Sequence, residues 1–219
     1  MLIGWRKHAE KNAKGVDSAM LRYVLIGGIG SGKTSVSNLF LEQGAYCIDL
    51  DTIGHRQLFD PNVKRELVET FGAEILDDAR QIDRARLAER AFASSEATAA
   101  LNAITHPRVI SMLKKRLDRG ENAGSGLCIV ESSAYAGPAS VDGLDDLIDG
   151  IIAVVADEEL RVQRAVARGM DEADVRARMA RQATDEERRA WADYVIENNG
   201  TLAALEAQVA ELYDSLVSV

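Results

Sequence analysis

The residues best suited to chemistry are the octet GGIGSGKT at positions 27–34, which follows the apolar run YVLI. The octet fits the pattern G-x-x-x-x-G-K-[ST], whose required setting is a strand before it and a helix after it. Its glycines let backbone N–H groups point inward toward a phosphate, and the start of the helix adds a positive dipole end. We therefore predict a cradle for a nucleoside triphosphate, in which Lys33 serves the outer phosphates and the Thr34 hydroxyl ligates Mg²⁺. A merely flexible turn is the weaker alternative.

Two carboxylates follow in Asp49-Leu50-Asp51, at the end of an expected second strand. Alternation along that strand would send Asp49 and Asp51 to the same side, beside the cradle. A carboxylate there can accept the proton of an attacking hydroxyl or help to hold Mg²⁺. Alternatively, one of the two caps a helix that starts near Thr52. The pattern does not decide which of them would be the base.

Arginines are concentrated between positions 161 and 189. Arg164 and Arg168 are four residues apart and share a helix face, as do Arg161 and Arg164. Guanidinium groups stay charged and bind phosphates bidentately, so they suit the electrostatic stabilisation of a transferring phosphoryl group. The same run could instead form a solvated helix face, because acidic residues are interspersed at positions 171–174.

The segment THPR at positions 105–108 lies in a region with helical periodicity. Proline disfavours helical geometry at the preceding residue, so we expect an interruption that presents His106 or Arg108 inward. His106 taken alone could equally be a structural histidine. The three histidines show no metal-ligand spacing, and no Cys–His arrangement points to zinc or thiol chemistry.

Strands and helices that alternate along the chain must position these residues. Apolar runs predict strands at 22–26, 45–50, 127–130, 151–155 and 193–196, and helices at 33–43 and 202–216. This order indicates an α/β fold with a parallel sheet covered by helices on both sides. The region from 51 to 118 shows only helical periodicity and is expected to form a helical subdomain near the strand ends, where such sheets bind ligands.

Composition limits the classes of function. The 219 residues, 47% of them hydrophobic, can bury a large core, and no apolar run is long enough to cross a membrane. A net charge of −9 disfavours a nucleic-acid partner and leaves a small-molecule substrate. Residues 1–19 lack the apolar stretch of a secretory signal and are expected to be a flexible extension. Cys47 and Cys128 are expected to be buried thiols in a reducing cytoplasm.

The order of motifs resembles the dephospho-CoA kinase family from about Leu21 to Leu216. It runs GGIGSGKT, IDLD, FG, IDRARLAERAF, ITHPR, RMARQ and ADYVIENNG. Only the first motif is widespread among nucleotide-binding proteins, and its combination with THPR and ADYVIENNG is more specific. The resemblance implies that ATP, with Mg²⁺, phosphorylates the 3′-hydroxyl of dephospho-CoA, the last step of CoA synthesis. It also implies a P-loop kinase, monomeric or weakly oligomeric.

The implied architecture has three parts within residues 20–219. They are a nucleotide core around a five-stranded parallel sheet (20–50, 127–160 and 190–219), a helical substrate-binding subdomain (51–126) and a small lid (161–189).

The resemblance also assigns roles to single residues. The catalytic candidates are Lys33, Asp51 as the base and Arg164 as the lid arginine that reaches the ATP phosphates. Asp49, His106 and Arg108 fall on the acceptor side, and Thr34 on the metal. The nucleotide-binding candidates are Gly28, Gly30, Ser31, Gly32, Lys33, Thr34, Ser35 and Asn198, the last of these near the adenine.

Three positions depart from the family pattern. His55 replaces an arginine, Glu131–Tyr135 (ESSAY) replaces Pro-Leu-Leu-x-Glu, and Arg161 replaces a glutamine. The first two changes fall near the acceptor side, so a diverged P-loop kinase with another nucleoside-like or alcohol acceptor is an alternative. A non-catalytic nucleotide-binding regulator is another, although the chain lacks the Asn-Lys-x-Asp element of a GTPase switch.

Overall fold

The computed structural model describes residues 20–218, so the expected N-terminal extension lies outside the described residues. The chain divides into two compact units. Among the described residues, those up to Asp49 and those from Arg116 onward form the sheet unit, and Leu50–Lys115 form the helical unit. Residues 116–126, which we assigned to the substrate subdomain, therefore group with the sheet unit.

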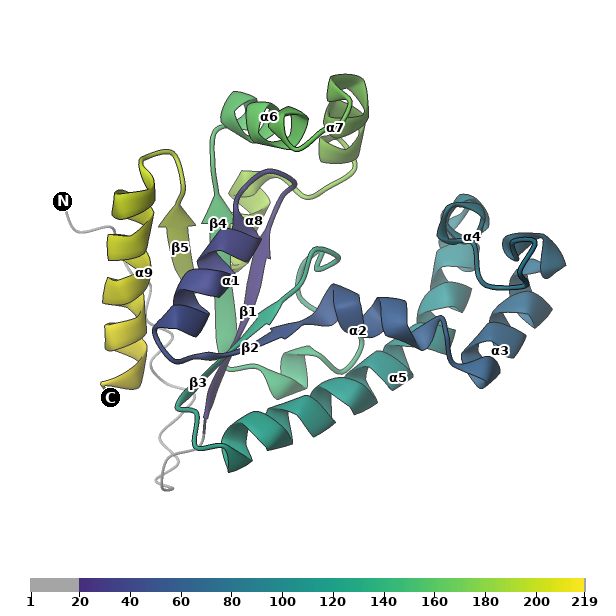
Figure 1. Ribbon diagram of the computed structural model, residues 1–219, viewed down its shortest axis with the longest axis horizontal. Helices are drawn as coiled ribbons and strands as arrows, with labels where there is room; N and C mark the ends of the chain where they lie inside the picture. The colour runs from purple at the N-terminus through teal and green to yellow at the C-terminus, as the bar shows by residue number, and fades with distance from the viewer. Residues whose placement is uncertain (1–19, 219) are drawn as a thin grey trace. The chain divides into compact units, whose positions relative to one another are not determined.

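The sheet unit is built on five parallel strands, as predicted (Figure 1). They are β1 (Leu21–Gly27), β2 (Tyr46–Asp49), β3 (Leu127–Glu131), β4 (Gly150–Val155) and β5 (Tyr194–Glu197), in the spatial order β2-β3-β1-β4-β5. All six residues of β4 are buried, as are the last five of β1, because helices cover both faces of a parallel sheet. The connection from β3 to β4 crosses β1, so the strand order reverses next to β1. Open parallel sheets bind ligands at the carboxyl ends of the strands at such a reversal.

Two helices cover one face of this sheet (Figure 1). They are α1 (Lys33–Glu42) and α9 (Leu202–Val217), which pack against each other. Val36 and Phe40 of α1 and Val209 and Leu212 of α9 are completely buried in one cluster with the strand side chains. This packing fixes the start of α1, and with it the loop that follows β1.

Three short helices follow β4. They are α6 (Glu158–Ala167), α7 (Glu172–Met179) and α8 (Asp185–Trp191). Val162, Ala165 and Val175 form a small apolar cluster of their own, and Ile29 from the loop after β1 packs on it. Helix α8 packs on β1 and β4 and starts with a capping box between Thr184 and Glu187. The segment between β3 and β4 contains a short 3₁₀ turn, η2 (Asp145–Leu147).

The helical unit contains α2 (Leu50–Gln57), α3 (Pro61–Phe71), the 3₁₀ turn η1 (Ala73–Ile75), α4 (Arg84–Ala91) and most of α5 (Ser95–Asn122). Asp60 and Asp83 cap α3 and α4 by accepting backbone N–H bonds in the first turn of each helix. The unit has a separate apolar core made of Val63, Leu67, Phe71, Ile75, Leu87 and Ala91.

Two local expectations were wrong. Strand β2 ends at Asp49 and α2 begins at Leu50, so Asp49 and Asp51 are not related by strand alternation. Helix α5 also runs through Pro107 without a break. A proline removes one backbone hydrogen bond, but α5 is 28 residues long and is anchored after Pro107 by the buried side chains of Val109 and Leu113. Packing therefore outweighed the local signal.

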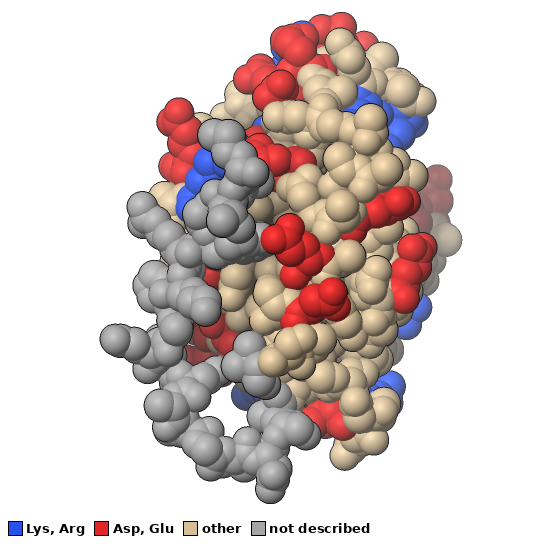
Figure 2. All heavy atoms as spheres, turned by 90° about the vertical axis from the view of Figure 1, so that its left-hand side faces the viewer, with Lys and Arg blue, Asp and Glu red and all other residues tan. Residues whose placement is uncertain are grey.

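The face that carries α9 is acidic, and Figure 2 shows red side chains scattered over it with few blue ones. Glu206, Glu211 and Asp214 of α9 are all exposed. A surface of this sign repels the phosphates of a nucleic acid. Within residues 20–218, no helix has the length and apolar character needed to cross a bilayer.

Candidate active site

The loop between β1 and α1 is shaped by close contacts at its glycines. Gly30 and Gly32 have φ angles of 76° and 97°, in the left-handed region that glycine adopts without strain. A Cβ at Gly32 would also overlap the amide of Asn198, and one at Gly27 would lie 2.6 Å from the carbonyl oxygen of Val154. The octet is therefore a defined turn held against two other segments.

Lys33 and Thr34 begin α1 and point to different partners. Lys33 is 8% exposed, and its Nζ donates a hydrogen bond of 2.8 Å to the carbonyl oxygen of Gly27 at the start of the loop. The Thr34 hydroxyl is exposed and donates to Glu131 Oε1 at 2.9 Å. The lysine thus spans the base of the loop, and the threonine faces a carboxylate.

Glu131 is the last residue of β3, and the sheet places one other acidic residue beside it. Its register partners are Leu25 of β1 and Asp49 of β2. A hydroxyl and a carboxylate in contact at the end of a phosphate loop suit Mg²⁺, which usually takes few protein ligands and completes its shell with water and phosphate oxygens. In residues 20–218 no group of three or more His, Cys, Asp or Glu side chains could hold a metal alone. The residues present therefore fit a metal that is shared with bound phosphates.

Asn198 and Arg164 flank the other side of the loop. Asn198 follows β5 directly and is 7% exposed, and its Nδ2 donates to the carbonyl oxygen of Ser31 at 2.8 Å. Arg164 of α6 donates from Nη2 to Asn198 Oδ1 at 3.4 Å. Its Nη1 is buried and has no hydrogen-bond partner in the described structure.

Arg164 keeps its charge in this setting. Burial, together with the nearby charge of Arg168, lowers the pKa of Arg164, but a guanidinium still remains protonated at neutral pH. A buried, charged donor that lacks a partner is costly unless a ligand completes it. An anion such as a phosphate would satisfy Nη1, and the phosphate contact expected of Arg164 stays a prediction.

Not every amide of the loop is available to a phosphate. The Ile29 N–H donates to Gln182 Oε1 at 2.9 Å, and the Ser31 N–H donates to the carbonyl oxygen of Gly28 at 3.1 Å. The Ser31 side chain is completely buried, and its hydroxyl has no partner among the described residues. The Ser31 carbonyl oxygen accepts from Asn198 and is not a phosphate-binding group, so the role of Ser31 in nucleotide binding stays a prediction. Ser35 is half-buried on α1 and stays a prediction.

The acceptor-side candidates are divided between the units. Asp49 is exposed at the end of β2 in the sheet unit, whereas Asp51 is half-buried in the first turn of α2 in the helical unit. Arg108 is half-buried on α5, pairs with Glu66 of α3 at 2.6 Å and donates from Nη1 to the carbonyl oxygen of Ile104. His106 is on the same helix, also half-buried.

Some residues at this site were missed from the sequence. Glu131 ends a buried apolar run, and the rule that ligands bind at the carboxyl ends of parallel strands would have indicated it. Gln182, which accepts the N–H of Ile29, and Asp185, which accepts from Arg161, carried no such signal, because nothing in their local sequence shows which residues they fold back on.

Comparisons with known proteins agree on one family. The model of the family described as dephospho-CoA kinase matches residues 23–204. A dephospho-CoA kinase of Corynebacterium efficiens is 43% identical over 203 residues, which is 91% of this chain and 98% of that one.

Solved structures agree as well. A crystal structure of a Thermus thermophilus protein superposes with a TM-score of 0.76 at 31% identity and covers 90% of this chain and 98% of its own. The dephospho-CoA kinase of Campylobacter jejuni, at 22% identity and a TM-score of 0.65, covers 90% of this chain and 97% of its own and shares the fold. With the phosphate loop, Lys33, Thr34 and the five-stranded parallel sheet in place, this chain belongs to the dephospho-CoA kinase family.

Proposed function

We propose that this protein transfers the γ-phosphoryl group of ATP to the 3′-hydroxyl of dephospho-CoA, which gives CoA and ADP. The observation that carries the proposal is the meeting of the Thr34 hydroxyl with Glu131 beside the buried Lys33, at the carboxyl end of the sheet. Membership of the dephospho-CoA kinase family supports this choice of acceptor. We infer that it acts in the cytoplasm, as a monomer or weak homo-oligomer.

On the donor side, three groups would act on the phosphates. Lys33 would exchange its bond to Gly27 for contacts with the outer phosphates, and Arg164 would offer its unpaired Nη1. Thr34 and Glu131 would hold a Mg²⁺ ion, which neutralises phosphate charge when it is bound. Asn198 supports both sides because it touches the carbonyl oxygen of Ser31 and the guanidinium of Arg164.

On the acceptor side, Asp51 would orient the 3′-hydroxyl and accept its proton as the hydroxyl oxygen bonds to the γ-phosphorus. The bond between that phosphorus and the β,γ-bridging oxygen breaks, and ADP leaves with the electron pair. Arg108, held by Glu66, would bind the acceptor with His106 nearby on α5. Asp49 stays the competing candidate for the base.

The test is an assay of ADP release in the presence of MgATP, with and without dephospho-CoA. Release that depends on dephospho-CoA is the expected result. Parallel reactions with nucleosides and nucleoside monophosphates examine the departures at His55 and Glu131–Tyr135. Release with one of those acceptors instead would contradict the proposed substrate, and binding of dephospho-CoA with no ADP formation would indicate a regulator.

A further inference from the structure

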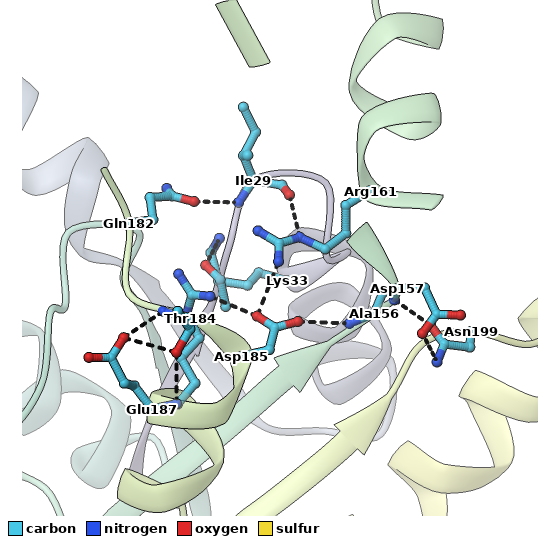
Figure 3. A network of polar contacts seen from close by, with 12 residues as sticks. Ile29, Lys33, Ala156, Asp157, Arg161, Gln182, Thr184, Asp185, Glu187 and Asn199 are labelled. Atoms are coloured by element: carbon cyan, nitrogen blue, oxygen red, sulfur yellow. Dashed lines mark hydrogen bonds and ion pairs between the residues drawn. The ribbon is translucent and has the colours of Figure 1, made fainter. Parts of the chain in front are cut away.

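Arg161 is a buried cation that contacts the phosphate loop at residues 28–30. It belongs to α6, it is 6% exposed, and its Nε donates a hydrogen bond of 3.0 Å to the carbonyl oxygen of Ile29 (Figure 3). A Cβ at Gly28 would overlap its guanidinium, and one at Gly30 would overlap its backbone carbonyl. Arg161 therefore fills the space that these two glycines leave open.

A second buried arginine shares the same carboxylate. Asp185 Oδ1 accepts from Arg161 Nη1 at 3.2 Å and from Arg188 Nη1 at 2.7 Å, while its Oδ2 accepts the N–H of Ala156 at 3.4 Å. Arg188 is 3% exposed. We call Arg161, Asp185 and Arg188 the arginine cluster.

The arginine cluster carries a net positive charge. Two guanidiniums and one carboxylate sum to +1, and both arginines are buried, while the Asp185 side chain is 22% exposed. Glu187 also acts on Arg188, but its carboxylate is exposed and solvent screens it. Burial, and the repulsion of Arg161 along with it, lower the pKa of Arg188, although Asp185 offsets part of this effect. A buried charge without full compensation is costly in free energy. An anion bound at the phosphate loop would compensate the net positive charge of the arginine cluster.

The loop is held on both sides of one residue. Gln182 accepts the N–H of Ile29, and Arg161 donates to its carbonyl oxygen, while the Ile29 side chain packs on the apolar cluster of α6 and α7. Both peptide groups that flank Ile29 are therefore fixed by residues from the segment 161–189. A guanidinium is suited to this task, because its fork can bond a carbonyl and a carboxylate at once.

We propose that Arg161 is a positioning residue for the donor nucleotide, which fixes the phosphate loop at Ile29 and, with Arg188, places a net positive charge behind Gly28. It acts through the loop and does not touch the phosphates. The inference rests on the donor half of the proposed function. It goes beyond the family resemblance, which leads to a glutamine at this position.

Calorimetric titration of the full-length protein with MgADP tests this role without any acceptor. Arg161→Gln removes the charge, and we expect its Kd for MgADP to rise on the order of tenfold. Arg161→Lys keeps the charge and should stay within about threefold of the unmodified protein. Arg188→Gln removes one positive charge from the same arginine cluster and should also raise the Kd for MgADP. This variant keeps the test decisive if Arg161→Gln does not fold.

Arg176→Gln is the matched control, because Arg176 lies in the same segment and pairs with Glu159 and Glu172 but is not bonded to the loop. We expect its Kd for MgADP to be unchanged. In the kinase assay, Arg161→Gln should raise the KM for ATP and leave the KM for dephospho-CoA unaltered.

Four outcomes would overturn the inference. If Arg161→Gln, or Arg188→Gln in its place, lowers the melting temperature but binds MgADP normally, the arginine cluster is only structural. If Arg161→Lys is as weak as Arg161→Gln, the charge is not what matters. If the unmodified protein does not bind MgADP, the proposed donor site fails and the inference fails with it. If the unmodified protein binds MgADP and Arg161→Gln binds it equally tightly, the inference fails but the proposed donor site does not.

Discussion

At the scale of residues, the site depends on contacts between positions far apart in the chain. Thr34 meets Glu131 across 97 residues, and Asn198 reaches Ser31 across 167. The motif around Lys33 was recognisable because all its residues are local. Glu131 was recognised only as a departure from a family pattern, because its role depends on the pairing of β3 with β1.

Glu131→Gln tests the metal half of the site. A glutamine keeps an oxygen that can accept from the Thr34 hydroxyl but loses the negative charge that attracts Mg²⁺. We expect the Mg²⁺ concentration for half-maximal activity to rise on the order of tenfold, with little change in the affinity for ADP measured without metal. A metal dependence identical to that of the unmodified protein would exclude Glu131 from the metal site.

Asp51→Asn tests the proposed base. An amide cannot accept the proton of the acceptor hydroxyl, so we expect kcat to fall by about a hundredfold or more. The Kd for MgADP should not change, because the groups proposed to bind the donor are Lys33, Thr34, Arg164 and Asn198. Asp49→Asn is the matched variant at the neighbouring acid; a larger loss of kcat there than at position 51 would transfer the base role to Asp49.

At the scale of elements, the sequence predicted strands and helices more reliably than their ends. The apolar runs of β3 and β4 were clear because helices cover both faces of a parallel sheet. The start of α2 was predicted near Thr52, two residues late, because Asp49 and Asp51 can both cap a helix and the sequence does not show which of them precedes it. Pro107 predicted a break that the packing of α5 overrides.

Helix α8 positions Asp185 and Arg188, and its first turn is held by Glu187. Hydrogen bonds from the N–H and the hydroxyl of Thr184 lower the pKa of Glu187 below its ordinary value of 4.5. A lowered pKa means that the ionised group stabilises the fold above pH 4.5, and that this contribution is lost as the pH falls through the lowered value.

Glu187→Gln should therefore lower the melting temperature at pH 7, and the difference from the unmodified protein should disappear at acid pH. Thermal unfolding followed by circular dichroism across this range measures it. Glu186→Gln is the control, since Glu186 is a neighbouring exposed carboxylate outside the capping box. A difference that persists unchanged at acid pH would show that the ionised carboxylate of Glu187 is not the stabilising group.

At the scale of the whole molecule, the two units have separate cores. The donor groups Lys33, Thr34, Arg164 and Asn198 all belong to the sheet unit, whereas Asp51, His106 and Arg108 belong to the helical unit. The sequence indicated this division, because residues 51–118 have helical periodicity without a strand. The sequence could not indicate that Glu66 of α3 pairs with Arg108 of α5. Helical periodicity predicts each helix but not which side chains of two helices come into contact.

Leu67→Ala tests whether the units contribute separately. Leu67 is completely buried in the core of the helical unit, and its truncation should cost about 2–5 kcal/mol of stability there. We expect turnover of dephospho-CoA to fall while calorimetry still finds normal MgADP affinity. Leu67→Met, which conserves volume, should have a much smaller effect. Parallel loss of MgADP affinity in Leu67→Ala would show that the donor site depends on the helical core.

The close contact between Gly28 and Arg161 also constrains how the sequence can evolve. A side chain at Gly28 meets the end of the Arg161 side chain, so Gly28→Ala should be harmful alone and much less so once Arg161 has been shortened. At Gly30 the obstacle is the backbone of residue 161, and φ is positive as well, so no substitution at 161 can relieve it. A substitution at Gly28 is therefore tolerated only after Arg161 has been replaced by a shorter residue, whereas a substitution at Gly30 is not tolerated in either order.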